Sequence, residues 1–344
     1  MAMVSTLESV IADHLAGWER AHVDLAIYGS DNPRLIAEAI DQFCRRELGS
    51  SALNGLFYQS SVSAVAGVTL ADGRRVVIKA HQTDWSAEQL RAVVTLQRHV
   101  ALTCGLAPDV LAGPSPLGNG LAVVEDFADR GSTRDAHDPV IRARLAYDLH
   151  RLIRCLERFV PSVELRPHGL ASVPPSSLWP TPHSKLFDFE STQRGAEYID
   201  RIAREARERI QCVGRTVICH GDWRAEHVRF EGDEIVVAFD WDSLCSVAEP
   251  WILGTTAHMF CADWSRDDVA QAPTLAEARA FVGDYEAARG QAFTREERRA
   301  CGAAFAYSIA YTARCGHSAG VDIRSEPGNH QYLIATEGFR LLDL

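Results

Sequence analysis

Apolar residues recur every three or four positions in the first fifty residues, which is the spacing of an amphipathic helix. The segments 7–21 and 33–48 both follow this pattern, and Asn32 followed by Pro33 is a typical helix start for the second of them. The sequence therefore predicts a helical N-terminal extension over residues 1–53.

The pattern then changes to runs that are rich in β-branched residues. Residues 57–80 contain two such runs around an Asp-Gly turn, which is typical of a β-hairpin. Residues 85–104 return to helical spacing, and residues 106–113 and 120–127 read as two further short strands. We expect an antiparallel sheet with one helix over residues 54–127.

From residue 128 onward the periodic segments are helical, apart from three short strands at 216–220, 227–232 and 234–241. Five prolines interrupt the segment 166–184, which we interpret as a loop, either a lid or a plain connection. These patterns predict an α+β fold in two lobes, a small antiparallel sheet followed by a larger, mainly helical lobe that spans 128–344.

Length and composition agree with two lobes and exclude several classes of protein. A chain of 344 residues with 47% hydrophobic and 24% charged residues is typical of a globular protein larger than one core. The net charge of −11, without a basic run, argues against a nucleic-acid partner. The sequence shows neither a membrane-length apolar run nor an export signal, so we expect a cytoplasmic protein, either a monomer or a homodimer.

The nine cysteines are scattered and contain no CxxC pair, so a zinc ribbon or a disulfide framework is not indicated. We expect each of them to be a free thiol that behaves as a small apolar residue, in a reducing compartment. They are Cys44, Cys104, Cys155, Cys212, Cys219, Cys245, Cys261, Cys301 and Cys315.

The strongest local motif is His-Gly-Asp at 220–222, which follows one predicted strand and precedes a hairpin that leads to Asp240. Such a hairpin places Asp222 and Asp240 at the ends of strands. One carboxylate can then activate a hydroxyl group while the other binds a metal ion at the same phosphate, which is a layout suited to phosphoryl transfer.

At these residues the chain resembles the aminoglycoside phosphotransferase and choline kinase-like family of small-molecule kinases, which have a protein-kinase-like fold. The resemblance spans roughly residues 55–255 and rests on the family motif H-G-D-x-x-x-x-N and on the Asp-Trp after the next strand. It implies that Asp222 is the catalytic base and that Asp240 binds the Mg²⁺ of the nucleotide.

The chain departs from the family at the second metal ligand, where His227 stands in place of asparagine. His227 could bind the metal weakly, hydrogen-bond Asp222 or a phosphate, or favour a softer ion such as Mn²⁺. Asp242 would lie on the same face as Asp240 if the strand continued, as an auxiliary metal ligand or a surface acid. Arg224 stands where protein kinases hold a basic residue near the γ-phosphate, while His220 is expected to be a buried structural residue.

The resemblance also implies a nucleotide site in the first lobe. Lys79 ends the run VVIK and corresponds to the strand lysine that holds the α- and β-phosphates of ATP or GTP. Kinases pair this lysine with a glutamate in the middle of the helix that follows. Here that helix offers Glu88 only near its start, and its middle positions are Val94, Thr95 or Gln97, so the usual pairing is absent. Three serines in a strand turn are expected to cover the phosphates, and the backbone near Glu125 is expected to bind adenine. The serines are Ser60, Ser61 and Ser63.

The acceptor is expected to be a small molecule with a hydroxyl group, such as an aminoglycoside or amino sugar, because the last helices carry acids that suit a cation. These are Asp263, Asp267, Asp268, Asp322, Glu326 and Glu337, together with the aromatic Trp264. Two alternatives stay open. One is a pseudokinase or nucleotide-binding regulatory module, and the other is a metal-dependent hydrolase with a binuclear cluster of histidines and aspartates that includes His220.

Overall fold

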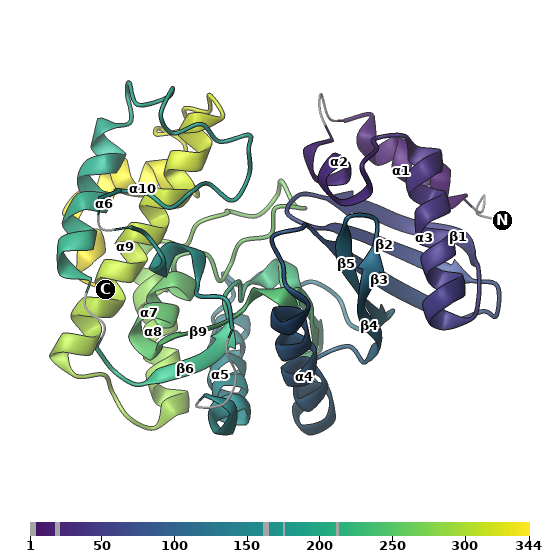
Figure 1. Cartoon of the computed structure of the whole chain (residues 1–344). Coiled ribbons are helices and arrows are strands. Elements are labelled where there is room, and N and C mark those ends of the chain that lie inside the picture. The colour runs from purple at the N-terminus through teal and green to yellow at the C-terminus, as the bar shows by residue number, and fades with distance from the viewer. Residues whose placement is uncertain (1–4, 18–20, 161–164, 175, 211–212) are drawn as a thin grey trace. The chain divides into compact units, whose positions relative to one another are not determined.

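The computed structural model describes residues 5–17, 21–160, 165–174, 176–210 and 213–344, and it divides into two compact units. The first unit comprises residues 1–102 and 107–129, and the second comprises residues 103–106 and 130–344. The ribbon in Figure 1 shows a sheet-containing unit and a mainly helical unit. The α+β class expected from the sequence is confirmed.

The first unit is built on a five-stranded antiparallel sheet with the order β1-β2-β3-β5-β4. The Asp72-Gly73 turn joins β2 to β3, as the sequence predicts, and a third strand, β1, precedes that hairpin. The strands are β1 (Ala52–Ser60), β2 (Ala64–Leu70), β3 (Arg75–His81), β4 (Val110–Leu117) and β5 (Gly120–Asp126). The helices are α1 (Leu7–Leu15), α2 (His22–Tyr28), α3 (Pro33–Leu48) and α4 (Ala87–Cys104).

The two faces of this sheet are covered by different helices. Helices α1 to α3 share one hydrophobic core with the sheet, in which Ile11, Ile40 and Phe43 pack with strand residues such as Ile78. Strand side chains alternate between the faces, so the opposite face carries Val123, which packs with Val94 of α4. The N-terminal helices are thus part of the sheet unit rather than an extension, because they bury its face.

The second unit contains six α-helices and two small antiparallel pairs of strands within its described residues. Strand β6 pairs with β9, and β7 forms a hairpin with β8. The strands are β6 (Thr216–His220), β7 (Val228–Glu231), β8 (Glu234–Ala238) and β9 (Leu244–Ala248). The helices are α5 (Pro139–Leu156), α6 (Glu197–Arg209), α7 (Glu249–Ala257), α8 (Leu275–Arg289), α9 (Arg295–Ser318) and α10 (His330–Glu337).

Several boundaries differ from the sequence prediction. The first helix ends at Leu15, and the predicted strand over 234–241 ends at Ala238, where the chain turns into a short 3-10 helix, η4 (Trp241–Ser243). The sequence analysis also missed β9, a short strand that pairs with β6 across a sequence separation of more than twenty residues. Pairing over such a distance leaves no local pattern in the chain.

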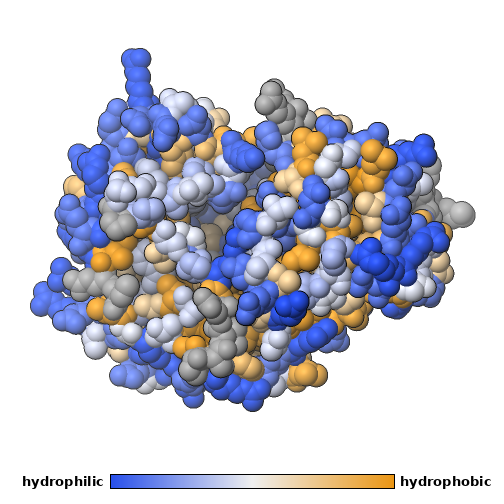
Figure 2. Space-filling model, in the orientation of Figure 1, coloured by the Kyte–Doolittle hydropathy of each residue, from blue (hydrophilic) through white to orange (hydrophobic). Residues whose placement is uncertain are grey.

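The surface shows no concentration of apolar side chains on the visible face. Figure 2 shows hydrophobic residues scattered among hydrophilic ones, and the large exposed hydrophobic residues belong to many different elements. Within the residues that the structure describes, no helix combines the length and the hydropathy needed to cross a membrane. Isolated exposed apolar residues are normal for a globular protein.

Eight of the nine cysteines lie in the described residues, and all eight are free thiols, as expected. Cys104 and Cys155 are half-buried and the other six are buried, so these side chains contribute to packing as small apolar groups. Cys212 lies outside the described residues.

Glu249 is a buried carboxylate that ties three segments of the second unit together. It begins α7 and is 0% exposed. The guanidinium of Arg215 lies 2.7 Å from one carboxylate oxygen, and Arg289 lies 3.3 Å from the other. The hydroxyl of Tyr285 also donates to Glu249 at 2.7 Å. Burial acts to raise the pKa of Glu249, but the hydrogen bonds from Arg215 and Tyr285 outweigh it and hold this pKa below its ordinary value.

Replacing Glu249 with glutamine should therefore lower the free energy of unfolding of the second unit by about 3–5 kcal/mol, because two arginines lose their buried counter-charge. A carboxyl whose folded pKa is depressed stabilises the fold above its unfolded pKa, and this contribution is lost as the pH falls through the folded pKa. Urea denaturation followed by tryptophan fluorescence, at neutral pH and in acid, measures both effects.

The matched control is Asp322→Asn, which removes a carboxylate from an exposed pair with Arg324. Exposed pairs contribute less than about 1 kcal/mol, so this variant should unfold almost as the parent does. Equal losses in the two variants would contradict the role of Glu249.

Candidate active site

Asp222 follows strand β6 through a turn that requires glycine at position 221. A Cβ at Gly221 would lie 2.8 Å from the backbone oxygen of Ser243 and 3.1 Å from the ring of His168. The amide of Gly221 donates to that same Ser243 oxygen at 3.0 Å. The close approach of the two segments fixes where Asp222 leaves the strand.

His220 connects the Asp222 loop to the segment that carries Asp240. Its imidazole is fully buried, and Nε2–H donates to the carbonyl oxygen of Phe239 at 2.8 Å. Nδ1 accepts from the amide of Asp222 at 3.2 Å. Burial, followed by the nearby His227, lowers the pKa of His220, which keeps the imidazole in the neutral form that this bonding pattern needs. The structural role expected for His220 is confirmed.

Two tryptophans enclose this histidine. The rings of Trp223 and Trp241 meet the His220 ring edge to face, at centroid distances of 5.7 and 5.6 Å. Each indole N–H has a backbone acceptor: Trp223 donates to Leu145 of α5, and Trp241 donates to Ala238 at the end of β8. Both aromatic residues are thereby fixed, so the hydrogen bonds of His220 are shielded from water.

Asp240 stands immediately before η4, in a backbone conformation that is unusual for its residue type. Its φ of 66° lies in the left-handed region, and among the described residues it is the one non-glycine residue there. Such a conformation costs about 1–3 kcal/mol and persists where the surrounding structure enforces it. Here the hydrogen bond from His220 to Phe239 holds the preceding residue, so the carboxylate of Asp240 is aimed by the backbone.

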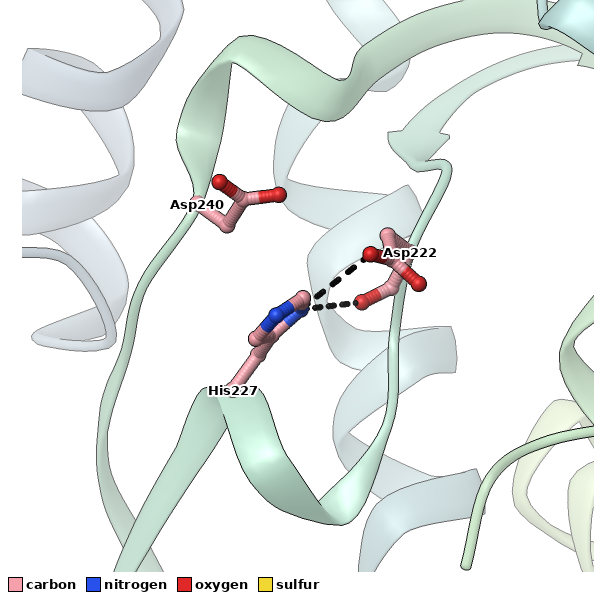
Figure 3. Close-up of side chains that lie close together, drawn as sticks. All are labelled: Asp222, His227 and Asp240. Atoms are coloured by element: carbon pink, nitrogen blue, oxygen red, sulfur yellow. Dashed lines mark hydrogen bonds and ion pairs between the residues drawn. The ribbon is translucent and has the colours of Figure 1, made fainter. Parts of the chain in front are cut away.

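Asp222, His227 and Asp240 form a group of possible metal ligands. Each offers one ligand atom, and these atoms lie within 4.8 Å of one another. Figure 3 shows the three side chains converging from two separate loops. The Nδ1–H of His227 donates to the backbone oxygen of Asp222 at 2.9 Å, and Nδ1 lies 3.5 Å from the Asp222 carboxylate. Two carboxylates and an imidazole are a donor set that fits a divalent cation.

Arg224 contacts the carboxylate of Asp222 directly. It forms an ion pair with Asp222, and its Nε–H donates to Glu226 at 2.9 Å. Burial acts to raise the pKa of Asp222, but the positive charge of Arg224 and the neighbouring His227 hold it below the ordinary value for aspartate. The carboxylate is therefore ionised and held in position at neutral pH.

Two other metal ligands considered from the sequence do not belong to this group. Asp242 lies within η4 because β8 ends at Ala238, so Asp242 does not share a strand face with Asp240. It is also outside the group of three ligands found in the described residues. Both ring nitrogens of His220 are used in hydrogen bonds to the protein, which removes the histidine that the binuclear hydrolase alternative needs.

Lys79 lies in the middle of the first unit's sheet. In the strand register it is opposite Val65 of β2 and Val123 of β5. Val123 packs with Val94 of α4, so the side chain of Lys79 leaves the sheet on the face that α4 covers.

Ser60 forms hydrogen bonds to the N-terminal helices, whereas the sequence analysis expected it to contact the phosphates. It is buried, and its hydroxyl donates to Asp24 at 2.8 Å. Its amide donates to Nε2 of His14 at 3.0 Å. Both donors of Ser60 bind the N-terminal helices, so we no longer expect this residue to contact phosphate. The sequence shows Ser60 in a turn but not which helix packs against it.

Ser61 and Ser63 form the tip of the turn between β1 and β2. The amide of Ser61 donates to the backbone oxygen of Ser63 at 3.2 Å, and the side-chain amide of Gln82 donates to the oxygen of Val62 at 2.7 Å. Ser61 is exposed while Ser63 is buried. The turn is thus tight and tied to the end of β3.

Glu125 lies inside the sheet rather than at an open backbone edge. Strand β5 is flanked by β3 and β4, and Glu125 is in register with Val77 on one side and Val110 on the other. Its backbone therefore cannot offer the free edge that adenine recognition needs. Its carboxylate accepts a hydrogen bond of 2.7 Å from Gln97, a buried residue of α4.

The sequence analysis missed two histidines of the proline-rich segment that lie beside the catalytic loop. Nε2 of His168 is 3.2 Å from the backbone oxygen of Gly221, and Nδ1 of His183 is 2.8 Å from the hydroxyl of Tyr311 on α9. Burial lowers the pKa of both histidines. No motif marks them, because their position depends on how the loop 166–184 packs on α9.

Four of the six acids expected to bind a cationic acceptor have local partners. Asp268 pairs with Arg266, Asp322 with Arg324 and Glu337 with Arg340. Asp263 is buried, and its carboxylate accepts hydrogen bonds from the amide and the hydroxyl of Ser265. Arginine partners close in sequence thus partly neutralise Asp268, Asp322 and Glu337, whereas Asp263 is held by neutral donors.

Comparison with known proteins places these features in a family. The model of the phosphotransferase enzyme family matches residues 60–300. No curated protein sequence matches the chain. A solved structure of the macrolide 2'-phosphotransferase of Brachybacterium faecium is similar, with a TM-score of 0.50 and 16% identity over 87% of this chain and 97% of that chain. The amicoumacin kinase, solved with AMP-PNP and Ca²⁺, has a TM-score of 0.51 and 11% identity over 86% of this chain and 88% of that chain.

The structural similarities, at this low identity, show the shared fold alone. The family match covers more than half of the chain, including the strand of Lys79 and the whole cluster around Asp222. The chain therefore belongs to the phosphotransferase enzyme family, and it is a small-molecule kinase with a protein-kinase-like fold.

Proposed function

We propose that this enzyme transfers the γ-phosphoryl group of ATP or GTP to a hydroxyl group of a small molecule, with Asp222 as the catalytic base. The observation that supports this most directly is the convergence of Asp222, His227 and Asp240 within 4.8 Å. Phosphoryl transfer needs a carboxylate for the attacking hydroxyl and a divalent cation at the phosphates, side by side.

Asp222 is suited to accept the proton of the acceptor hydroxyl. Its lowered pKa keeps it ionised, and Arg224 and His227 fix its orientation. Because the buried His220 holds the Asp222 amide, the carboxylate needs little rearrangement before the reaction. Arg224 is therefore a positioning residue for the base in this proposal.

Asp240 and His227 would hold the nucleotide-bound divalent cation, either Mg²⁺ or Mn²⁺. When bound, the cation neutralises the negative charge that develops on the transferred phosphoryl group. In the first unit, Lys79 would provide a positive charge for the α- and β-phosphates, and the tip at Ser61 and Ser63 would offer hydrogen-bond donors to them.

We also propose an uncharged acceptor in place of the cationic acceptor expected from the sequence. Asp222 interacts electrostatically with three histidines, His168, His183 and His258. Burial lowers the pKa of all three, that of His258 to about 3. These imidazoles are therefore neutral at neutral pH. His168 and His258 use both ring nitrogens in hydrogen bonds to the protein, whereas the ring bond of His183 to Tyr311 is made by Nδ1. A hydroxyl group of the acceptor would thus bind at Nε2 of His183.

Aromatic rings lie next to these histidines on α9 and the proline-rich segment. The rings of His183 and Tyr311 have centroids 5.9 Å apart, and Trp179 stacks on Tyr307 at 5.6 Å. Tyr307 is 0% exposed and Tyr311 is 9% exposed, so these rings pack the proline-rich segment against α9 rather than form a surface for a ligand.

Replacing Asp222 with asparagine should lower kcat by about 10²–10⁴-fold and leave the nucleotide affinity within a factor of a few, because the amide cannot accept the hydroxyl proton. Acceptor-dependent ADP or GDP release and isothermal titration with AMP-PNP give the two readouts. Full turnover in this variant would exclude Asp222 as the base.

Replacing Asp240 with asparagine should weaken the binding of metal–nucleotide by on the order of tenfold or more, because a metal ligand loses its charge. Titration of AMP-PNP at fixed Mg²⁺ measures the effect, and titration without a divalent cation provides the control. An unchanged affinity in the presence of Mg²⁺ would argue against Asp240 as a ligand.

The acceptor class can be tested with a coupled assay of nucleotide consumption, using ATP and GTP. Uncharged polyols and sugars should give a higher kcat/KM than aminoglycosides, amino sugars, choline-like alcohols or homoserine. A preference for aminoglycosides would restore the cationic acceptor. Nucleotide binding without turnover on any acceptor would instead support the pseudokinase or regulatory module, which the histidine at position 227 favours.

A further inference from the structure

His227 has a defined tautomer in its neutral form, because its hydrogen-bond partner can only accept. Nδ1 lies 2.9 Å from the backbone carbonyl oxygen of Asp222. A carbonyl oxygen has no proton to donate, so Nδ1 must carry the hydrogen. In the neutral imidazole the lone pair then belongs to Nε2, and a metal-binding histidine is typically oriented by a hydrogen bond of this kind.

The position of His227 within the site makes this lone pair relevant. One ring nitrogen of His227 and one carboxylate oxygen each of Asp222 and Asp240 lie within 4.8 Å of one another, and all three side chains are half-buried. His227 extends from the 3-10 helix η3 (Ala225–His227), whose last amide donates to the oxygen of Arg224 at 3.0 Å. Figure 3 shows the imidazole beside both carboxylates.

An imidazole can replace an asparagine amide here without losing either function of the amide. An amide side chain has a donor and an acceptor, and so has a neutral imidazole. His227 retains the donor, which holds the Asp222 backbone, and exchanges the oxygen ligand for a nitrogen ligand. With histidine at this position, one ring nitrogen supports the Asp222 backbone and the other can serve as a nitrogen ligand.

We propose that Nε2 of His227 ligates the nucleotide-bound cation, and that this nitrogen makes the site favour a transition-metal ion such as Mn²⁺ over Mg²⁺. Mg²⁺ prefers oxygen ligands in octahedral geometry, whereas imidazole nitrogen suits first-row transition metals. With carboxylate and phosphate oxygens completing the set, Mn²⁺ accepts the whole arrangement. The inference rests on the proposed function, because it takes Asp240 and His227 as the residues that hold the nucleotide's metal ion.

Pulsed electron paramagnetic resonance of Mn²⁺ bound with AMP-PNP to the full-length enzyme tests the ligation directly. The wild-type complex should show modulation from an imidazole ¹⁴N, and His227→Asn should lose it. The control is His317→Asn, which removes an imidazole that bonds to the backbone oxygen of Arg194 and should retain the modulation. Absence of ¹⁴N modulation in a wild-type complex that binds Mn²⁺ and AMP-PNP would overturn the inference.

Calorimetric titration of AMP-PNP with each metal gives an independent readout. The ratio of the dissociation constants with Mg²⁺ and Mn²⁺ should fall by on the order of tenfold in His227→Asn, since an oxygen ligand replaces the nitrogen. An unchanged ratio would also overturn the inference. Failure of the proposed function would look different, because the protein would then bind AMP-PNP with neither metal.

Discussion

The arrangement of Asp222, His227 and Asp240 depends on one buried neutral histidine. His220 donates to the backbone beside Asp240 and accepts from the backbone of Asp222, so a single ring fixes the relative position of the two loops. A charged imidazole would lose its acceptor, and burial between two tryptophans opposes protonation. A second link reinforces the first, since the amide of Phe239 donates to the oxygen of His227 at 2.8 Å. Backbone hydrogen bonds thus hold the two loops that carry the proposed chemistry, and Arg224 and His227 then orient the carboxylate of Asp222.

This organisation explains how the enzyme tolerates like charges at close range. Asp222 and Asp240 are both half-buried acids with ligand atoms inside a span of 4.8 Å. Arg224 offsets the charge of Asp222, and the left-handed backbone at Asp240 sets the point from which its side chain extends. A cluster with surplus negative charge and restrained geometry is prepared for a cation. Glu249 shows the contrasting case, a carboxylate fully compensated by arginines, which serves to hold helices together.

The sequence allowed much of the local structure to be predicted, but it misassigned residues whose role depends on a distant partner. The helix over 33–48, the Asp72-Gly73 turn and the buried His220 were predicted correctly, since capping, turn chemistry and a contiguous motif are local. Ser60 and Glu125 were expected at the nucleotide, and the structure shows them bound to Asp24 and Gln97. Each partner is about thirty residues away in the chain, where no periodicity connects them.

The sequence by itself determined the order of the elements and the chemical groups available, because hydrophobic spacing and the motif at 220–227 are properties of the chain. Only the tertiary structure decided which groups meet. It ended β8 at Ala238, so Asp242 does not share a strand face with Asp240. It also brought His168 beside Gly221 and gave His227 a carbonyl partner that sets its tautomer. The physical reason is that burial and hydrogen-bond partners are set by packing between distant segments, and these determine the charge, tautomer and direction of a side chain.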